Sequence, residues 1–240
     1  MYNFTIIAAA EKAPFDMSLP YIATSFELFG ITFNLTSSVV TQWIVMVFLG
    51  ILFFVLGRNL KVKPTGKRQM IAEAIVTFFR DMVIDGMGEK YVAYTPYIAT
   101  VLISSLSFSL SGLFGYRPPT ADIMVLGSWG IITFILTQRN KFKTGGVKGF
   151  FKSFIDPTPV MLPMNLVGEL TNPLSQVFRH FGNILGGMLI MGIVYWALGS
   201  FAVVVPAVLS LYFDLFSATI QAYIFAMLTM VYVSSADCSE

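Results

Sequence analysis

The sequence is short of the residues from which catalytic and metal sites are usually built. Among its 240 residues there are one cysteine, Cys238, and one histidine, His180. A single thiol excludes an internal disulfide, and one thiol with one imidazole is too few for the common metal sites. A GxxxxGK[ST] motif is also absent, so we expect no nucleotide bound through a P-loop. The sequence therefore predicts no metal site of the usual ligand types and no bound cofactor.

Charged residues are scarce as well. They make up 12% of the chain, whereas soluble domains carry about 25%, and 56% of the residues are hydrophobic and lie in long blocks. This composition predicts an all-α polytopic membrane protein with one membrane domain over residues 39–240. Residues 1–38 are mixed and weakly acidic, and we expect them to form an external N-terminal segment. The opening MYNFTIIAAAEK lacks a basic region before an apolar core, so no cleavable signal peptide is expected.

Apolar runs predict about five membrane-embedded helices, near residues 39–57, 92–115, 123–137, 162–198 and 203–235. Basic residues gather after the first and third of these runs. The two clusters hold ten of the fifteen basic residues, namely Arg58, Lys61, Lys63, Lys67 and Arg68, then Arg139, Lys141, Lys143, Lys148 and Lys152. The positive-inside rule places both clusters in the cytoplasm. We therefore expect a multi-pass protein of the cell (inner) membrane with its N-terminus outside and its C-terminus in the cytoplasm.

Residues 70–88 differ from these spans, because apolar and charged residues alternate there at helical spacing. This pattern predicts an amphipathic helix that lies on the cytoplasmic surface or against a partner. The second span is rich in serine, which favours close helix packing over free contact with lipid. The last two helices are longer than a perpendicular span needs, so they are expected to tilt. We place the break between them near Gly199–Ser200.

The penultimate helix carries a charge at membrane depth. Arg179 stands in the run PLSQVFRHFGNILGGMLI, and an arginine there costs between roughly 3 and more than 10 kcal/mol. Steps of three and four residues put a small polar set on one helix face: Ser175, Arg179, Gly182, Asn183 and Gly186. Glycines at positions 182 and 186 would let another helix approach closely. His180 points about 100° away from this face, so a packed histidine is the expected role.

The last helix carries a second polar stripe, made by Ser210, Asp214, Ser217 and Gln221. In an antiparallel hairpin, Asp214 would lie toward the external end and Gln221 nearer to Arg179. An internal ion pair of Arg179 with Asp214 or with Glu169 is the alternative. Glu169 is ten residues from Arg179 on one helix, about 15 Å along the axis, which is too far for direct contact.

At this point the sequence resembles subunit a of the membrane sector of bacterial F-type ATP synthases. The resemblance covers about residues 44–235, and its most specific parts lie in the last two helices. The segments that carry it are Pro163–Glu169, Asn172–Ser175, Arg179-His-Phe-Gly-Asn183, the final helix Gln221–Tyr232 and the loop Pro118–Asp122. The resemblance implies a long tilted hairpin packed against a ring of c subunits, with b subunits of the peripheral stalk and the rest of the complex as further partners.

The resemblance also implies roles for single residues. Arg179 matches the arginine that faces the ion-binding carboxylate of the ring, and Asn183 and Gln221 match polar residues near it. Asp214 matches a position in the external half-channel, and Glu169 one linked to the cytoplasmic half-channel. Ser175 and Ser217 complete the predicted ion-translocation set, with His180 and Asp122 as possible contributors. The sequence departs from the family pattern at His180, Met188 and Ser111, where leucine, Glu or His, and asparagine are common.

The resemblance implies ion translocation by a non-catalytic subunit in the lipid bilayer, with no nucleic acid involved. Protons are the expected ion, and Na⁺ is the alternative, because the choice depends largely on ligands in the c subunit. Another function class is a self-contained secondary transporter in which Arg179 binds an anionic substrate. No repeat between the two halves supports that class. A purely structural scaffold would leave Arg179, Asn183 and Gln221 without a role.

Overall fold

The computed structural model describes residues 22–28, 31–61, 66–156, 158–198 and 204–237. Most of the predicted N-terminal segment, the break near Gly199–Ser200 and Cys238 lie outside these residues. Helices dominate the described part, and four of its helical segments are long and apolar enough to cross a membrane: Ser37–Gly57, Glu89–Phe114, Pro159–Leu198 and Val208–Ser235. The chain is therefore an all-α polytopic membrane protein, which confirms the predicted fold class.

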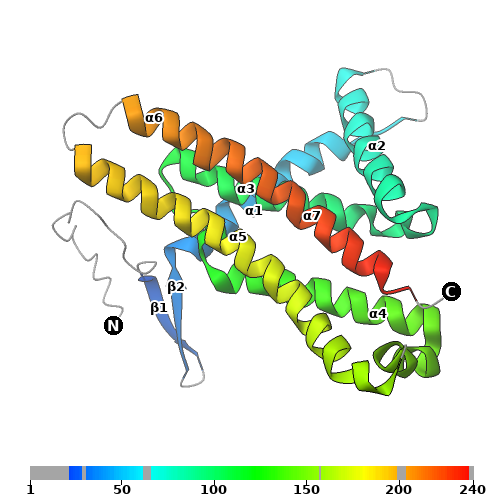
Figure 1. The fold of residues 1–240 in the computed structure, drawn as a ribbon. Helices are drawn as coiled ribbons and strands as arrows, with labels where there is room; N and C mark the ends of the chain where they lie inside the picture. The colour runs from blue at the N-terminus through cyan, green and yellow to red at the C-terminus, as the bar shows by residue number, and fades with distance from the viewer. Residues whose placement is uncertain (1–21, 29–30, 62–65, 157, 199–203, 238–240) are drawn as a thin grey trace.

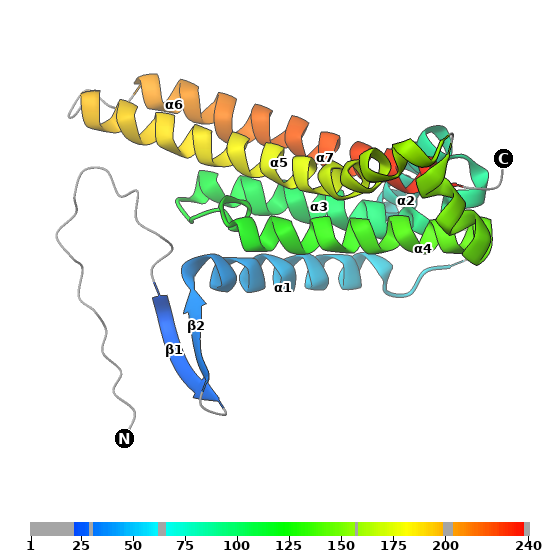
Figure 2. The ribbon, with the colours of Figure 1, turned by 60° about the horizontal axis from the view of Figure 1, so that its bottom comes forward.

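A small β-hairpin precedes the helices. Strands β1 (Ile22–Leu28) and β2 (Ile31–Thr36) pair antiparallel, with Phe26 opposite Phe33. The hairpin projects from one end of the helical bundle and leads directly into the first helix (Figure 2). The sequence prediction for residues 1–38 contained no strand. Two runs with β-branched and aromatic residues on either side of Gly30 were the available signal.

The first two helices differ in how much of their surface the protein covers. Helix α1 (Ser37–Gly57) buries only Ser37, Ser38 and Thr41. Its remaining length is largely exposed apolar surface, as suits a helix in lipid. Helix α2 (Lys67–Met87) buries Phe79, Val83 and Met87 instead, and it ends at Gly88, whose φ of 92° suits glycine.

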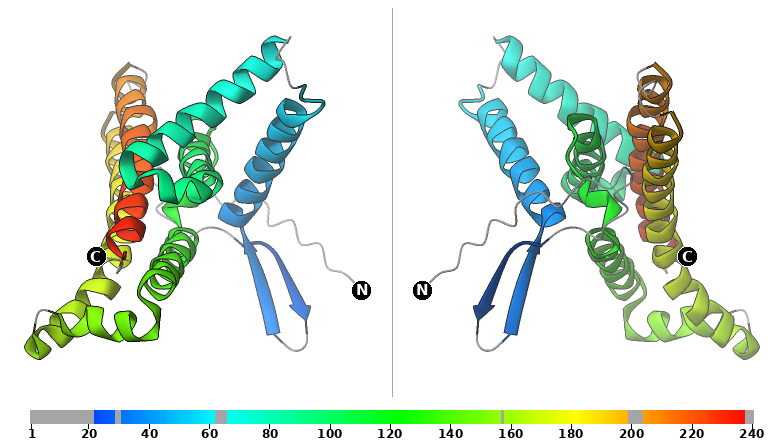
Figure 3. Two further views of the ribbon diagram at one scale, coloured as in Figure 1. Left: turned by 90° about the vertical axis from the view of Figure 1, so that its right-hand side faces the viewer. Right: turned by 90° about the vertical axis from the view of Figure 1, so that its left-hand side faces the viewer.

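The predicted amphipathic helix is thus α2, and its partner belongs to the same chain. Val83 and Met87 pack with residues of α3 (Thr95–Leu110) and α7 (Ala218–Ser235) in one apolar cluster. End-on views show α2 crossing from the α7 side of the bundle to α1 (Figure 3). Short 3₁₀ turns flank α3, namely η1 (Glu89–Tyr94) and η2 (Ser111–Phe114).

Helix α4 (Ile123–Ile155) is much longer than the predicted span at 123–137. It follows the 3₁₀ turn η3 (Pro119–Ala121), and Asp122 caps it by accepting a hydrogen bond from the Met124 amide at 3.0 Å. Arginine, lysine and glutamine favour helix, so the basic cluster ends the apolar run without ending the helix. The helix bends at Gly146, where φ is 59°. The position of the membrane boundary within α4 stays a prediction.

The last two predicted helices form the expected antiparallel hairpin (Figure 1). A 3₁₀ turn, η4 (Pro159–Met161), precedes α5 (Leu162–Leu198). The return limb is continuous from α6 (Val204–Ser210) through the π-helical segment η6 (Leu211–Ser217) into α7. The sequence did not predict the π segment, because an i→i+5 hydrogen-bond shift leaves no mark in composition.

The described residues of the two basic clusters lie at the same end of the bundle, with the C-terminus of α7 (Figure 2). We call it the basic end, and define it by the last turn of α1, the start of α2 and residues 139–152 of α4. The η2 and η3 turns, the last turn of α5 and the start of α6 lie at the opposite end. This arrangement agrees with the predicted pairing of the clusters on one side of the membrane.

Candidate ion-translocation site

One face of α5 has no covering partner within the described chain. Ser175, Arg179, Gly182 and Asn183 are exposed, and Gly186 is partly exposed. No atom lies within 4 Å of the position that a Cβ atom would take on Gly182 or Gly186. We call these five residues the α5 face. Among the described residues, no other helix makes the predicted close approach at these two glycines, so this part of the face is open.

Arg179 has no carboxylate partner among the residues that the structure describes. The ion pairs there are Lys90–Asp237, Lys141–Glu169 and Lys152–Asp156. Neither alternative internal pair, Arg179–Asp214 or Arg179–Glu169, is therefore formed. Arg179 lies on the exposed α5 face.

Two of the predicted polar residues do meet across the hairpin. The Asn183 side-chain amide donates a hydrogen bond to Oε1 of Gln221 at 2.7 Å. Gln221 is only 3% exposed, whereas Asn183 lies on the exposed face. Gln221 was expected to reach Arg179, but in the structure it bonds one turn farther along α5. The bond joins the predicted stripes of α5 and α7.

This bond fixes the positions of Arg179, Asp214 and Glu169 relative to one another along the axis of the hairpin. Arg179 lies four residues from Asn183, about 6 Å toward the basic end, and Asp214 lies seven residues from Gln221, about 10 Å toward the opposite end. Glu169 is about 15 Å beyond Arg179 toward the basic end. The two carboxylates thus lie on either side of Arg179, each about 15 Å away along the hairpin axis.

Asp214 lies in the π segment and faces the η2 turn. A Cβ atom on Gly112 would lie 3.9 Å from Oδ1 of Asp214. Ser217, half-buried, is on the same segment. π-Helical turns are frequent at functional sites because they redirect side chains. Met188, where the family pattern often has a polar residue, instead packs against an apolar cluster of Ala121, Ile184 and Ala218.

His180 and Asp122 both lie away from the α5 face. His180 is fully buried, and its ring meets Phe225 edge-on at 5.6 Å between centroids, as expected for a packed histidine. One turn earlier, the Gln176 amide donates to the Phe225 carbonyl at 2.8 Å and to the Thr229 hydroxyl at 2.9 Å. These contacts fasten α5 to α7 on the side away from the α5 face. Asp122 acts as the cap of α4.

Glu169 pairs with residues that the sequence analysis did not select. Nζ of Lys141 forms an ion pair with Oε1, and the Gln138 amide donates to Oε2 at 2.7 Å. Lys141 was assigned to a cytoplasmic loop, yet it lies on α4 and is 9% exposed. The available signal was the i, i+4 series Thr133, Thr137 and Lys141, which continues a polar stripe into the basic cluster.

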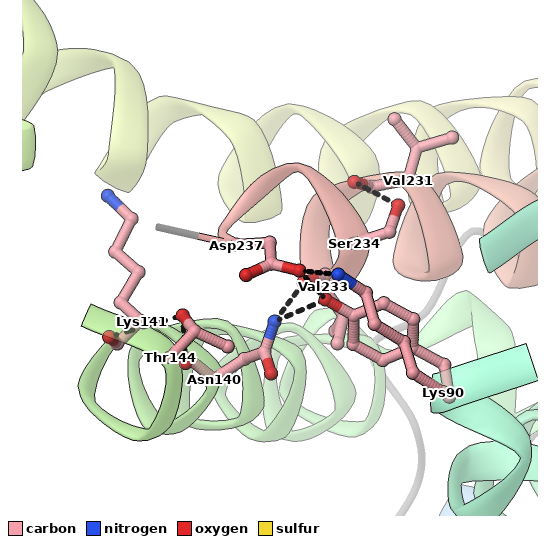
Figure 4. A network of polar contacts seen from close by, with 9 residues as sticks. Lys90, Asn140, Lys141, Thr144, Val231, Val233, Ser234 and Asp237 are labelled. Carbon is pink, nitrogen blue, oxygen red and sulfur yellow. Dashed lines mark hydrogen bonds and ion pairs between the residues drawn. The ribbon is translucent and has the colours of Figure 1, made fainter. Parts of the chain in front are cut away.

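A second polar cluster, at the C-terminus of α7, is also fully paired (Figure 4). The Asn140 amide donates to the Val233 carbonyl at 2.8 Å and to the Tyr91 hydroxyl at 3.2 Å. The Tyr91 hydroxyl donates to Asp237 at 2.9 Å, and Asp237 also pairs with Lys90. We call Lys90, Tyr91, Asn140 and Asp237 the latch. Lys141 extends away from it (Figure 4).

Comparison with known proteins agrees with this architecture. The family model described as ATP synthase A chain matches residues 39–234. Similar proteins include "ATP synthase subunit a, sodium ion specific" of Propionigenium modestum, 37% identical over 85% of this chain and 75% of the relative. "ATP synthase subunit a" of Moorella thermoacetica is 32% identical over 83% and 89%, and "ATP synthase subunit a 1" of Pelobacter propionicus is 34% identical over 83% and 86%. The chain therefore belongs to the ATP synthase A chain family.

Proposed function

We propose that this chain passes ions to and from a rotating ring of c subunits, with Arg179 facing the ion-binding carboxylate of the ring. As a family member it is a multi-pass, ion-translocating subunit of the ATP synthase membrane sector and is not itself catalytic. The single observation that carries the proposal is the exposed Arg179, which has no carboxylate partner in the described chain.

The α5 face has the properties that such a contact needs. A lone guanidinium at membrane depth is costly, so a partner of opposite charge is required to offset the cost. Gly182 and Gly186 have open space around them and would admit a neighbouring helix at close range. Gln176 and His180 hold the other side of α5 against α7, so the face is presented on a supported helix.

The two carboxylates supply a route on each side of Arg179. By the positive-inside rule the basic end is cytoplasmic, which places Glu169 in a cytoplasmic half-channel and Asp214 in an external one. The same rule puts the N-terminus outside and the C-terminus in the cytoplasm. Because each carboxylate is about 15 Å from Arg179 along the hairpin, the cation separates the two routes and opposes direct leakage between them.

The proposed cycle follows from electrostatics. A ring carboxylate must be neutral, protonated or ion-bound, while it faces lipid. Near Arg179 its charged form becomes favourable, so the ion leaves into one half-channel. The next site reloads from the other half-channel before it returns to lipid. A potential of 100 mV contributes about 2.3 kcal/mol per charge, so several ions per turn can drive synthesis elsewhere in the complex.

Arg179→Ala tests the proposal most directly. We expect the variant to assemble and to lose ATP-driven ion pumping in proteoliposomes containing the purified complex. Arg80→Ala is the matched control, because it removes the same groups from an exposed position on α2, and it should pump normally. Robust pumping by Arg179→Ala would refute the proposal.

Protons are the proposed coupling ion, and the b subunits of the peripheral stalk are proposed as further partners. One relative is named as sodium ion specific, so Na⁺ is the alternative coupling ion that an experiment must distinguish from protons. Titration of Na⁺ at fixed pH during ATP hydrolysis by the assembled complex separates them. Proton coupling predicts hydrolysis independent of Na⁺, whereas saturable activation by Na⁺ would overturn it.

A further inference from the structure

The ion pair between Lys141 and Glu169 lies at the wall of a cavity near the basic end. The cavity has a volume of about 140 Å³. Its polar lining comes from α4, α5 and α7, and includes Thr133, Thr137, Asn172 and Ser235 besides the ion pair. A water molecule takes about 30 Å³ in the liquid, so the cavity has room for several waters with polar partners.

Both oxygens of Glu169 already have donors from α4. Lys141 pairs with Oε1, and Gln138, three residues earlier on the same helix, donates to Oε2 at 2.7 Å. The side chains of Lys141 and Glu169 are only 11% and 16% exposed. The carboxylate is therefore oriented and balanced by charge, and is not a free anionic site.

Lys141 is itself held in place from a second side. Its Nζ atom lies 4.9 Å from the ring centroid of Phe154, on the part of α4 beyond the bend at Gly146. An ammonium near an aromatic ring is attracted by the negative potential of the ring face. Lys141 thus stands between Phe154 and Glu169, with its charge fixed at the cavity wall.

We propose that Lys141 is a positioning residue that sets the charge balance of this cavity for passing cations. The inference rests on the proposed function, because it assumes that ions move along the Glu169 side of the hairpin. With both residues present, the wall carries no net charge from the pair. A lone ammonium would repel cations, and a lone carboxylate would hold them, so either single loss slows passage.

The test compares the wild-type complex with four variants at this pair, three that neutralise one or both charges and one that keeps the positive charge. Glu169→Gln leaves Lys141 uncompensated, and we expect ATP-driven pumping to fall by about tenfold or more. Lys141→Gln should also lower pumping, whereas Lys141→Arg should retain it. The double variant Lys141→Gln/Glu169→Gln restores neutrality and should pump several-fold faster than Glu169→Gln alone. Pumping is normalised to the amount of subunit in the purified complex.

Recovery of pumping per assembled subunit in the double variant is the decisive result, because an obligatory carboxylate relay does not predict it. A purely structural ion pair predicts recovery of the amount of assembled subunit instead, since loss of both partners of a buried pair costs less than loss of one. A double variant as slow as Glu169→Gln overturns the inference, as does wild-type pumping by Lys141→Gln. If Glu169→Gln does not assemble, the contrast between Lys141→Gln and Lys141→Arg decides. Arg179→Ala is measured alongside: its normal pumping would refute the proposed function, whereas its inactivity together with a failed recovery refutes only the role of Lys141.

Discussion

The α5 face and the latch differ in whether their polar side chains are paired within the described chain. In the latch, Asn140, Tyr91 and Asp237 find their partners on three different elements of the same chain. On the α5 face, Arg179 is exposed and has no carboxylate partner in the described residues. The polar groups of the latch are thus paired within the fold. The contrast supports the proposed contact of Arg179 with another subunit.

Glycines show the same contrast. A Cβ atom on Gly130 of α4 would lie 2.5 Å from Cγ2 of Val177, and one on Gly187 would lie 3.3 Å from Phe213. These glycines allow helices of this chain to pack closely. Gly182 has no atom within 4 Å of its Cβ position and lies on the α5 face. Gly130 and Gly187 thus serve contacts inside the described chain, whereas Gly182 does not.

The largest expected effects come from leucine substitutions at Gly130, inside the bundle, and at Gly182, on the α5 face. The first should lower the amount of folded subunit, and the second should lower pumping. Gly130→Leu overpacks the α4–α5 contact, where Val177 is stiff, at a cost of about 1–3 kcal/mol or more, so the amount of folded subunit in membranes should fall strongly. Gly182→Leu should leave that amount unchanged and reduce ATP-driven pumping to a small fraction, since its side chain would block a ring helix. Immunoblots and pumping assays measure the two effects. Normal pumping by Gly182→Leu would show that no helix packs there.

Sequence patterns predicted the hairpin well because its signals are local. The apolar run with its closing Gly199–Ser200 predicted α5 at 162–198, and the structure has Leu162–Leu198. The helix face with Arg179 followed from periodicity alone. The end of α4 was missed, because lysine and arginine mark the end of an apolar run but favour helix.

What the sequence could not provide depends on packing between distant residues. Lys141 sits in a basic cluster, and only the tertiary structure shows that it pairs with Glu169, 28 residues later. Asparagine 183 and Gln221 were both selected, but their direct bond requires the register of the hairpin. Which glycine meets a neighbour likewise depends on the facing helix, so Gly130 and Gly182 look alike in the sequence.

The Asn183–Gln221 bond joins the α5 face to the interior of the hairpin. Its loss should lower the stability of the complex by an amount between the effects at the glycines and those in the latch. Asn183→Ala leaves the buried Oε1 of Gln221 without its partner, which costs about 1–3 kcal/mol. The double variant with Gln221→Ala should cost little more than one single variant, with a coupling of about 0.5–3 kcal/mol. Thermal unfolding of the purified complex measures the cycle.

Pumping should slow in all three of these variants without uncoupling, since Arg179 remains. Asn165→Ala is the matched control, because Asn165 is on α5 but donates to the Phe154 and Asp156 carbonyls at 3.0 Å. It should show no coupling with Gln221→Ala. Additive effects of Asn183→Ala and Gln221→Ala would mean that the bond does not connect the two helices in the working complex.

The smallest effect is expected in the latch. Lys90 has a 62% exposed side chain, so its pair with Asp237 contributes about 1 kcal/mol or less, and Asp237→Asn keeps an oxygen that can accept from Tyr91. Thermal stability should therefore change little and pumping not at all. Asn140→Ala should cost more, since the buried amide donates to both Val233 and Tyr91. A loss of pumping in Asp237→Asn at unchanged stability would contradict the contrast between the latch and the α5 face. Asp237, although paired within the fold, would then act in transport.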